Sequence, residues 1–225
     1  MKRKGFDWVS HETIYKLIRE DKANGGTLYT HLRHKGKHRR RPVGKFIPIR
    51  NRVSIEERPE AVDMRNRIGD WEMDTILGKN GRDAIVVLTE RLTRFTMMQR
   101  SPNGKNADAV ANTVIDMLIP YKKVVLTITT DNGTEFAEHE RIAKKLDAKV
   151  FFAHPYSSWE KGLVENTNKL IRQYIPKRTS FRDISDDFIH SVQLKLNSRP
   201  REKLNFDAPK NKFFVYSQER VAFTC

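Results

Sequence analysis

The sequence predicts an α/β fold in which a mixed five-stranded sheet is flanked by helices. The first observation is a series of three strand-like runs, Trp71–Leu77, Ala84–Thr89 and Phe95–Arg100, joined by connections of hairpin length. The second is an alternation of helical and strand-like runs after them, which is typical of parallel strands covered by helices. A small helical and basic segment precedes this domain.

The second half of the domain alternates between helices and short buried strands. Prolines at 120, 176 and 200 follow three of the helical runs and limit their length. Three antiparallel strands followed by helix, strand, helix, strand and helix is the ribonuclease H-like layout. The predicted elements are a helix over 107–118, a strand over 124–130, a helix over 135–146, a strand over 149–152, a helix over 163–174 and a last helix over 188–197.

Residues 1–32 are predicted to form a small helical segment of their own. Ser10 begins a helix in which Ile14, Leu17 and Ile18 form an apolar stripe. The Asn-Gly-Gly-Thr run at 24–27 ends it, and a second short helix follows. Two short helices around a turn are either half of a helix-turn-helix or a small packing appendage.

A basic linker is predicted over residues 33–66, before the α/β domain over 67–225. No acidic residue occurs between Lys22 and Ile55, and basic residues there alternate with Gly and Pro, which favours an extended chain. A basic run is usually only solvated, but the density of this one favours contact with phosphates. The residues of the run predicted to bind DNA are Arg33, Lys35, Lys37, Arg39, Arg40 and Arg41.

The composition indicates a polyanionic partner. The 225 residues include 43 Lys and Arg against 28 Asp and Glu, which gives a formal charge of +15. This charge fits nucleic acid or an anionic membrane surface, and a structural RNA-binding protein is the alternative on charge alone. No apolar run approaches the roughly 20 residues of a membrane span. The single cysteine, Cys225, offers neither a disulfide framework nor a zinc site, and we expect a soluble cytoplasmic protein.

Three carboxylates are predicted to form a metal site. Asp131 follows a buried strand and precedes a turn, where α/β sheets collect their ligands. Asp74 lies within a strand, where a charge is costly unless it has a function, and Glu165 lies on a helical run. Oxygen ligands of this kind suit two Mg²⁺ or Mn²⁺ ions, which catalyse phosphoryl transfer by activating the attacking oxygen and stabilising the leaving one.

Two neighbouring acids compete with Asp74 on the same strand. Glu72 has the same strand parity as Asp74 and is the main alternative ligand. Asp70 shares that parity, but it stands at the start of the strand and is interpreted as structural.

Several other residues near the carboxylates have two interpretations. Lys161, Lys169 and Arg172 share a helix face with Glu165, where they either position DNA phosphates or only form ion pairs. Trp159 is either a core or rim aromatic, or a ring that stacks on a base. His154 is interpreted as structural, with contact to DNA or metal as the alternative.

In these segments the chain resembles bacterial insertion-sequence transposases of the DDE type, whose catalytic core is similar to that of retroviral integrases. The resemblance is strongest to the family named after insertion sequence thirty, and it extends from about residue 10 to residue 209. The separation of Asp131 and Glu165 also fits that family. The matching blocks are Ile68–Thr75, Thr130–Phe136, Trp159–Asn168, Arg172–Lys177 and Leu196–Arg201.

The resemblance implies a transposase that catalyses DNA recombination and integration. Asp74, Asp131 and Glu165 would be its catalytic metal ligands for 3′-end cleavage and strand transfer. Its partners would be double-stranded DNA, namely the terminal inverted repeats and the target, on which it would act as a homo-oligomer in the bacterial nucleoid. Because the family has a longer DNA-binding region, the chain is expected to be truncated at its N-terminus.

Two alternatives remain open on the sequence. The first is a ribonuclease H-like nuclease without strand transfer, which would use the same carboxylates. The second is a catalytically silent, truncated DNA-binding remnant, since a shortened chain keeps its three acids.

Overall fold

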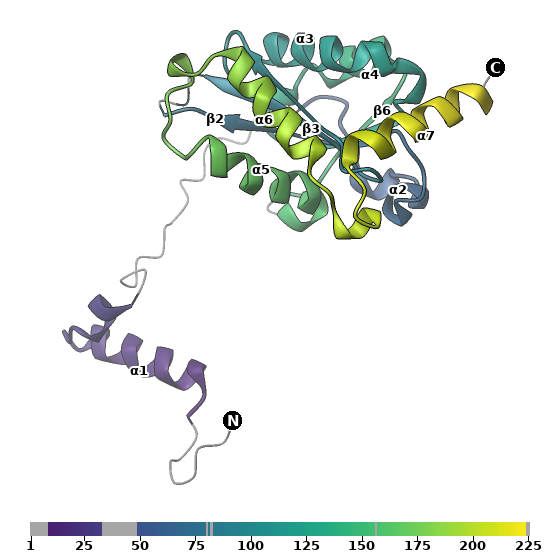
Figure 1. Cartoon of the computed structure of the whole chain (residues 1–225). Helices are drawn as coiled ribbons and strands as arrows, with labels where there is room; N and C mark the ends of the chain where they lie inside the picture. The colour runs from purple at the N-terminus through teal and green to yellow at the C-terminus, as the bar shows by residue number, and fades with distance from the viewer. Residues whose placement is uncertain (1–8, 33–48, 80, 82, 156, 224–225) are drawn as a thin grey trace. The chain divides into compact units, whose positions relative to one another are not determined.

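The computed structural model describes residues 9–32, 49–79, 81, 83–155 and 157–223. The chain divides into two compact units, Met1–Phe46 and Ile47–Cys225, drawn in Figure 1. Within the described residues, no helix is long and apolar enough to cross a membrane.

The first unit contains the predicted N-terminal helix, α1 (His11–Ala23), and the short 3₁₀-helix η1 (Leu28–His31). The side chain of Ser10 caps α1 by accepting a hydrogen bond from the Thr13 N–H at 3.2 Å. Asp21 links the two helices, because its Oδ2 accepts the Leu28 N–H at 2.9 Å. The apolar stripe of α1 is largely exposed.

The second unit is built on a six-stranded sheet with the order β1-β6-β5-β2-β3-β4. β2, β3 and β4 are antiparallel to one another, whereas β5 and β6 run parallel to β2. The five predicted strands are therefore present, and the two-residue β1 adds a parallel edge beside β6. The strands are β1 (Val53–Ser54), β2 (Asp70–Leu77), β3 (Ala84–Glu90), β4 (Thr96–Ser101), β5 (Thr127–Thr130) and β6 (Lys149–Phe152).

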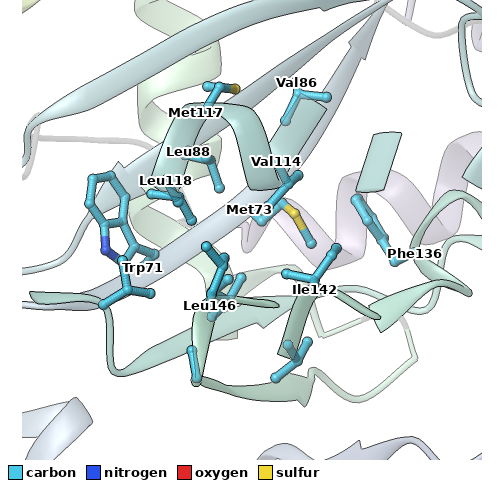
Figure 2. Packing of buried hydrophobic residues seen from close by; sticks show 14 of the residues in the cluster. Trp71, Met73, Val86, Leu88, Val114, Met117, Leu118, Phe136, Ile142 and Leu146 are labelled. Atoms are coloured by element: carbon cyan, nitrogen blue, oxygen red, sulfur yellow. The ribbon is translucent and has the colours of Figure 1, made fainter. Parts of the chain in front are cut away.

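Helices cover both faces of this sheet, with α3 and α4 along one face and α5 along the other (Figure 1). The alternation along β2 sends Trp71 and Met73 into the core beneath α3 and α4 (Figure 2). Ile76 of β2 packs on the opposite side with α5 and α6. The helices are α2 (Glu60–Met64), α3 (Ala107–Leu118), α4 (His139–Leu146), α5 (Gly162–Tyr174), α6 (Asp186–Ser198) and α7 (Pro209–Phe223), with 3₁₀-helices η2 (Ile55–Glu57), η3 (Ile119–Val124), η4 (Thr134–Phe136), η5 (Ser158–Lys161), η6 (Phe181–Asp183) and η7 (Glu202–Leu204).

The helix over 188–197 is not the last one, because α7 follows α6 in the structure. Its residue Phe213 is fully buried, stacks on Phe95 at 4.3 Å between ring centroids and meets the edge of Trp71 at 5.7 Å. The apolar residues of α7 fall side by side at 213–215 instead of at helical spacing. The sequence pattern therefore hides a helix that packing on the core stabilises.

The basic linker predicted over 33–66 contains secondary structure in its described part, residues 49–66. This part forms β1, η2 and α2, and it buries Ile49 and Val62. The contacts that hold it come from far along the chain: Arg91 donates to the Val62 carbonyl at 3.1 Å. Composition alone does not report such contacts.

Candidate active site

Two of the three predicted carboxylates lie at the same edge of the sheet. β2 and β5 run parallel with Glu72 paired to Thr129. Two residues further along each strand, this register brings Asp74 of β2 beside Asp131, which directly follows β5. The carboxyl ends of parallel strands are where an α/β sheet exposes a ligand site.

The ammonium group of Lys161 lies between these two carboxylates. Its Nζ is 3.2 Å from Asp131 Oδ2 and 3.6 Å from Asp74 Oδ1. It also donates to the Met73 carbonyl at 3.4 Å, and the residue is only 4% exposed. Of the two interpretations of Lys161, ion pairing is the one seen in this structure, where the residue is a buried counter-ion of the acidic pair.

The electrostatics of Asp74 reflect this arrangement. Burial raises the pKa of Asp74, and the Lys161 ammonium opposes that shift, while the Asp131 charge adds to it. The second oxygen of the carboxylate is fixed separately, because Asn168 Nδ2–H donates to Asp74 Oδ2 at 2.8 Å. Asp131 is more open, and its Oδ1 accepts the Gly133 N–H at 3.0 Å.

Glu165 lies on α5 between two residues that touch Asp74. It precedes Asn168 by three positions, so these two residues share a face of α5, and Lys161 is the residue just before the helix begins. Nevertheless, the structure does not complete a three-carboxylate cluster: among the described residues, no three His, Cys, Asp or Glu side chains are close enough to hold a metal ion.

Glu72, the alternative ligand, has a structural role in this arrangement. The side chain is fully buried and pairs with Arg91 Nη1 at 2.6 Å. Its other oxygen accepts the N–H groups of Leu163 and Val164 at 3.0 and 2.9 Å. A carboxylate at this position caps the N-terminus of α5 and complements the helix dipole, so it fixes the helix that carries Glu165.

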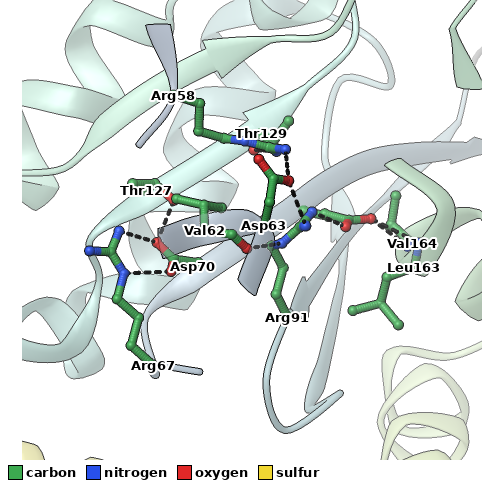
Figure 3. Close-up of polar contacts among 11 residues, drawn as sticks. Arg58, Val62, Asp63, Arg67, Asp70, Arg91, Thr127, Thr129, Leu163 and Val164 are labelled. Atoms are coloured by element: carbon green, nitrogen blue, oxygen red, sulfur yellow. Dashed lines mark hydrogen bonds and ion pairs between the residues drawn. The ribbon is translucent and has the colours of Figure 1, made fainter. Parts of the chain in front are cut away.

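Asp70 is structural, in agreement with its interpretation from the sequence. Arg67 donates to both of its oxygens, at 2.8 and 3.1 Å, and the Thr127 hydroxyl donates at 2.7 Å (Figure 3). These contacts join the start of β2 to the start of β5. Figure 3 also shows Arg91 reaching the Val62 carbonyl and Asp63 from the same region.

Glu135 and Asn168 also lie beside the site, although neither is predicted as a site residue from the sequence. Glu135 is buried, accepts the Thr75 hydroxyl at 3.0 Å and pairs with Lys105 at 2.7 Å. A Cβ at Gly133 would be 2.5 Å from Glu135 Oε2, so any larger residue in this turn would displace the Glu135 carboxylate. The spacing of three residues from Glu165 was a signal for Asn168, whereas the pairing of Glu135 depends on segments far apart in sequence.

The predicted DNA-binding residues have different surroundings. Lys169 is exposed on α5. Arg172 donates to the Leu77 and Pro176 carbonyls at 2.9 and 3.3 Å, and so holds the ends of β2 and α5. Those of the basic run, Arg33, Lys35, Lys37, Arg39, Arg40 and Arg41, lie outside the described residues.

The loop after β6 is held by two carboxylates around His154. Glu160 accepts the His154 N–H at 2.7 Å and contacts its Nδ1 at 2.8 Å, while Glu56 lies 3.2 Å from Nε2. The hydrogen bond to Glu160 raises the pKa of the imidazole, and the second carboxylate adds to that effect. These contacts give His154 a structural role.

Comparisons with known proteins agree on one family. Residues 65–158 match the integrase core domain family. The transposase for insertion sequence element IS4351 of Bacteroides fragilis is 46% identical over 97% of this chain and 68% of its own length. The transposase for IS1086 of Cupriavidus metallidurans is 34% identical over 89% of the chain and 61% of its own length. The transposase InsI for IS30A of Escherichia coli K12 is 36% identical over 90% of the chain and 55% of its own length.

The chain thus spans about half to two thirds of the length of these relatives. A solved structure supports the fold. The crystal structure of the catalytic core domain of BIV integrase superimposes with a TM-score of 0.54 at 20% identity, over 68% of this chain and 97% of that one. The predicted ribonuclease H-like layout is therefore confirmed.

Proposed function

Because the chain belongs to the IS30-type insertion-sequence transposases with an integrase-like core, we propose that it cleaves the 3′ ends of its element and joins them to target DNA. The observation that carries this proposal is the convergence of Asp74 and Asp131 on one cationic group, the Lys161 ammonium. Two carboxylates that hold an internal cation form a site in which a metal ion can replace it.

The chemistry of these donors fits a divalent metal. Mg²⁺ and Mn²⁺ prefer carboxylate oxygens and keep several waters, so a few acidic side chains suffice. We propose that Asp74, Asp131 and Glu165 hold two such ions, with Glu165 completing the set from α5. When bound, the ions would activate the attacking water or 3′ hydroxyl and stabilise the leaving oxygen.

The surrounding residues orient these ligands. Asn168 holds one oxygen of Asp74, and the Gly133 N–H holds one oxygen of Asp131. Glu72 fixes the N-terminus of α5, which carries Glu165. Lys161 has to withdraw when a metal ion binds, and its flexible side chain then supplies a cation for a nearby phosphate of the DNA.

The proposed partners are the terminal inverted repeats of the element and the target DNA. The formal charge of +15 supports a polyanionic partner. The basic run that contains Arg39, Arg40 and Arg41 is proposed to follow the phosphates. We further propose that the protein acts as a homo-oligomer on DNA, because two element ends must be joined to one target.

The test is incubation of the full chain with terminal-repeat DNA, target DNA and Mn²⁺. The proposal predicts joined products that disappear in Asp74→Asn, while binding of the DNA is retained, because the substitution removes transition-state stabilisation. Nicks without joining would indicate a nuclease. Bound but intact DNA would indicate a silent DNA-binding protein, and either outcome would contradict the proposal.

A further inference from the structure

Trp159 is an exposed aromatic residue two positions before Lys161, the residue that contacts both site carboxylates. It is 75% exposed and Phe206 is 74% exposed, which makes them the two most exposed large hydrophobic residues in the described part of the chain. Tryptophan is usually well buried, and exposing its indole to water is unfavourable. A ring in this state therefore suggests a binding partner.

The backbone after Trp159 is held in place by the side chains of the next two residues. Glu160, the next residue, is tied to His154 by two hydrogen bonds. The residue after that, Lys161, reaches Asp131 and Asp74. The Gly162 N–H also donates to the Trp159 carbonyl and closes η5. The ring is thus presented from a fixed turn, two residues from the group that contacts both carboxylates.

The surroundings of the ring favour a single flat ligand over a protein surface. A protein partner needs a contiguous apolar patch of several hundred Å², but Ser157 and Glu160, the neighbours of the ring along the chain, are polar. A nucleobase needs only one ring, and stacking of this kind is common in basic proteins that bind single strands. The charge of the chain fits that partner.

We propose that Trp159 stacks on an unpaired DNA base next to the phosphodiester that is cleaved or joined, an inference that rests on the proposed function. In an intact duplex both faces of each base are covered by its neighbours, so only an unstacked or terminal base has a face to offer. Trp159 would thereby favour frayed element ends over closed ones and keep the scissile phosphate close to Asp74 and Asp131.

The test measures binding of the full chain to two DNA probes by fluorescence anisotropy in Ca²⁺. One probe is a duplex with a short unpaired tail, and the other is the same duplex with blunt ends. Trp159→Ala is expected to weaken binding of the tailed probe about 5- to 150-fold, the range for stacking of one base. Binding of the blunt duplex should change less than about twofold. Trp159→Phe, which keeps a ring, should lose only part of the affinity, and Phe206→Ala, which removes an equally exposed ring after η7, should lose none.

Abasic nucleotides placed one at a time along the tail identify the stacked base. At that position the abasic site should weaken binding by the wild type as much as Trp159→Ala does, and it should cause no further loss in the variant. The salt slope should stay unchanged, because no phosphate contact is lost. Equal loss on both probes, no loss on either, or additive effects at every position would overturn the inference.

The two proposals fail in different ways. If the wild type joins DNA ends and Trp159→Ala behaves like it on both probes, only the stacking is wrong. If the wild type neither cleaves nor joins DNA, the proposed function itself is wrong.

Discussion

Lys161 holds the two site carboxylates together in the absence of a metal ion. Asp74 and Asp131 are close enough to share one ammonium group, at 3.6 and 3.2 Å. Without that cation they would repel each other. The residue therefore both stabilises the site and competes with any metal for it.

Replacing Lys161 with Gln should increase Mn²⁺ affinity by about tenfold, or about 1.4 kcal/mol, because the competing cation is removed. Calorimetric titration of the full chain without DNA measures this directly. Lys169→Gln is the matched control, since it removes the same charge from an exposed position of α5. Equal or weaker Mn²⁺ binding by Lys161→Gln would show that the ammonium does not occupy the metal position.

Asp74→Asn should stabilise the metal-free protein at pH 7. Folding raises the pKa of Asp74, chiefly through burial, so the charged carboxylate lowers stability at any pH above its folded pKa. This cost shrinks as the pH falls through the folded pKa, and it is absent below the unfolded value of about 3.9. The melting temperature of the variant in EDTA should exceed that of the wild type at pH 7 and approach it near pH 4.

Asp116→Asn on the exposed face of α3 controls for the change in net charge in that experiment. Added Mn²⁺ should raise the melting temperature of the wild type and of Asp116→Asn, but not that of Asp74→Asn. A lower melting temperature for metal-free Asp74→Asn at pH 7 would mean that the contacts with Lys161 and Asn168 outweigh the burial of the charge.

At the scale of elements, Glu72 joins β2 to α5 and to the turn after β3. Both of its oxygens have partners, Arg91 on one side and the N–H groups of Leu163 and Val164 on the other. The helix that carries Glu165 is therefore positioned by a carboxylate two residues from Asp74. Figure 3 shows how Arg91 extends the same network to α2 through Val62 and Asp63.

Glu72→Gln should lower the free energy of unfolding by about 3–5 kcal/mol, because it removes the buried carboxylate that pairs with Arg91 and leaves only the longer, 3.4 Å pair with Asp63. Urea unfolding measures the loss. The double variant Glu72→Gln with Arg91→Met should recover part of it, since no buried charge then remains unpaired. A loss below about 1 kcal/mol in the single variant would leave Glu72 free to act as a ligand.

At the scale of the whole molecule, the charge excess should govern DNA affinity through salt. Changing Arg39, Arg40 and Arg41 together to Ala should weaken binding to every duplex alike. It should also flatten the plot of log affinity against log salt by about 0.9 per lost phosphate contact. The residues of this run lie outside the described part of the chain, so the prediction rests on the sequence.

The control is a triple variant with the same loss of charge elsewhere. Three exposed lysines far along the chain from the basic run serve this purpose: Lys144 and Lys145 on α4, and Lys149 at the start of β6. Their change to Ala should leave the slope close to that of the wild type. Equal slopes for both variants would show that only the net charge matters and that the basic run is a solvated linker.

The sequence by itself determined the five main strands and the helices from 107 to 198. It also determined which of these elements carry Asp74, Asp131 and Glu165. These features are local: alternation with a period of two, apolar residues at helical spacing, and turn residues at the ends. Asp131 could be placed at a strand end because the Asp-Asn-Gly turn follows a buried run. Lys149–Phe152 was predicted with the bounds that β6 has in the structure.

Only the tertiary structure decided what each charged side chain does. Glu72 and Asp74 share one strand face, and no local pattern separates them; Arg91, far along the chain, binds the first and leaves the second to Lys161. The packing of residues 49–66 and of α7 likewise depends on distant partners such as Arg91 and Phe95. The physical reason is that burial and ion pairing are set by which segments the fold brings together, whereas sequence periodicity reports only which face a residue occupies.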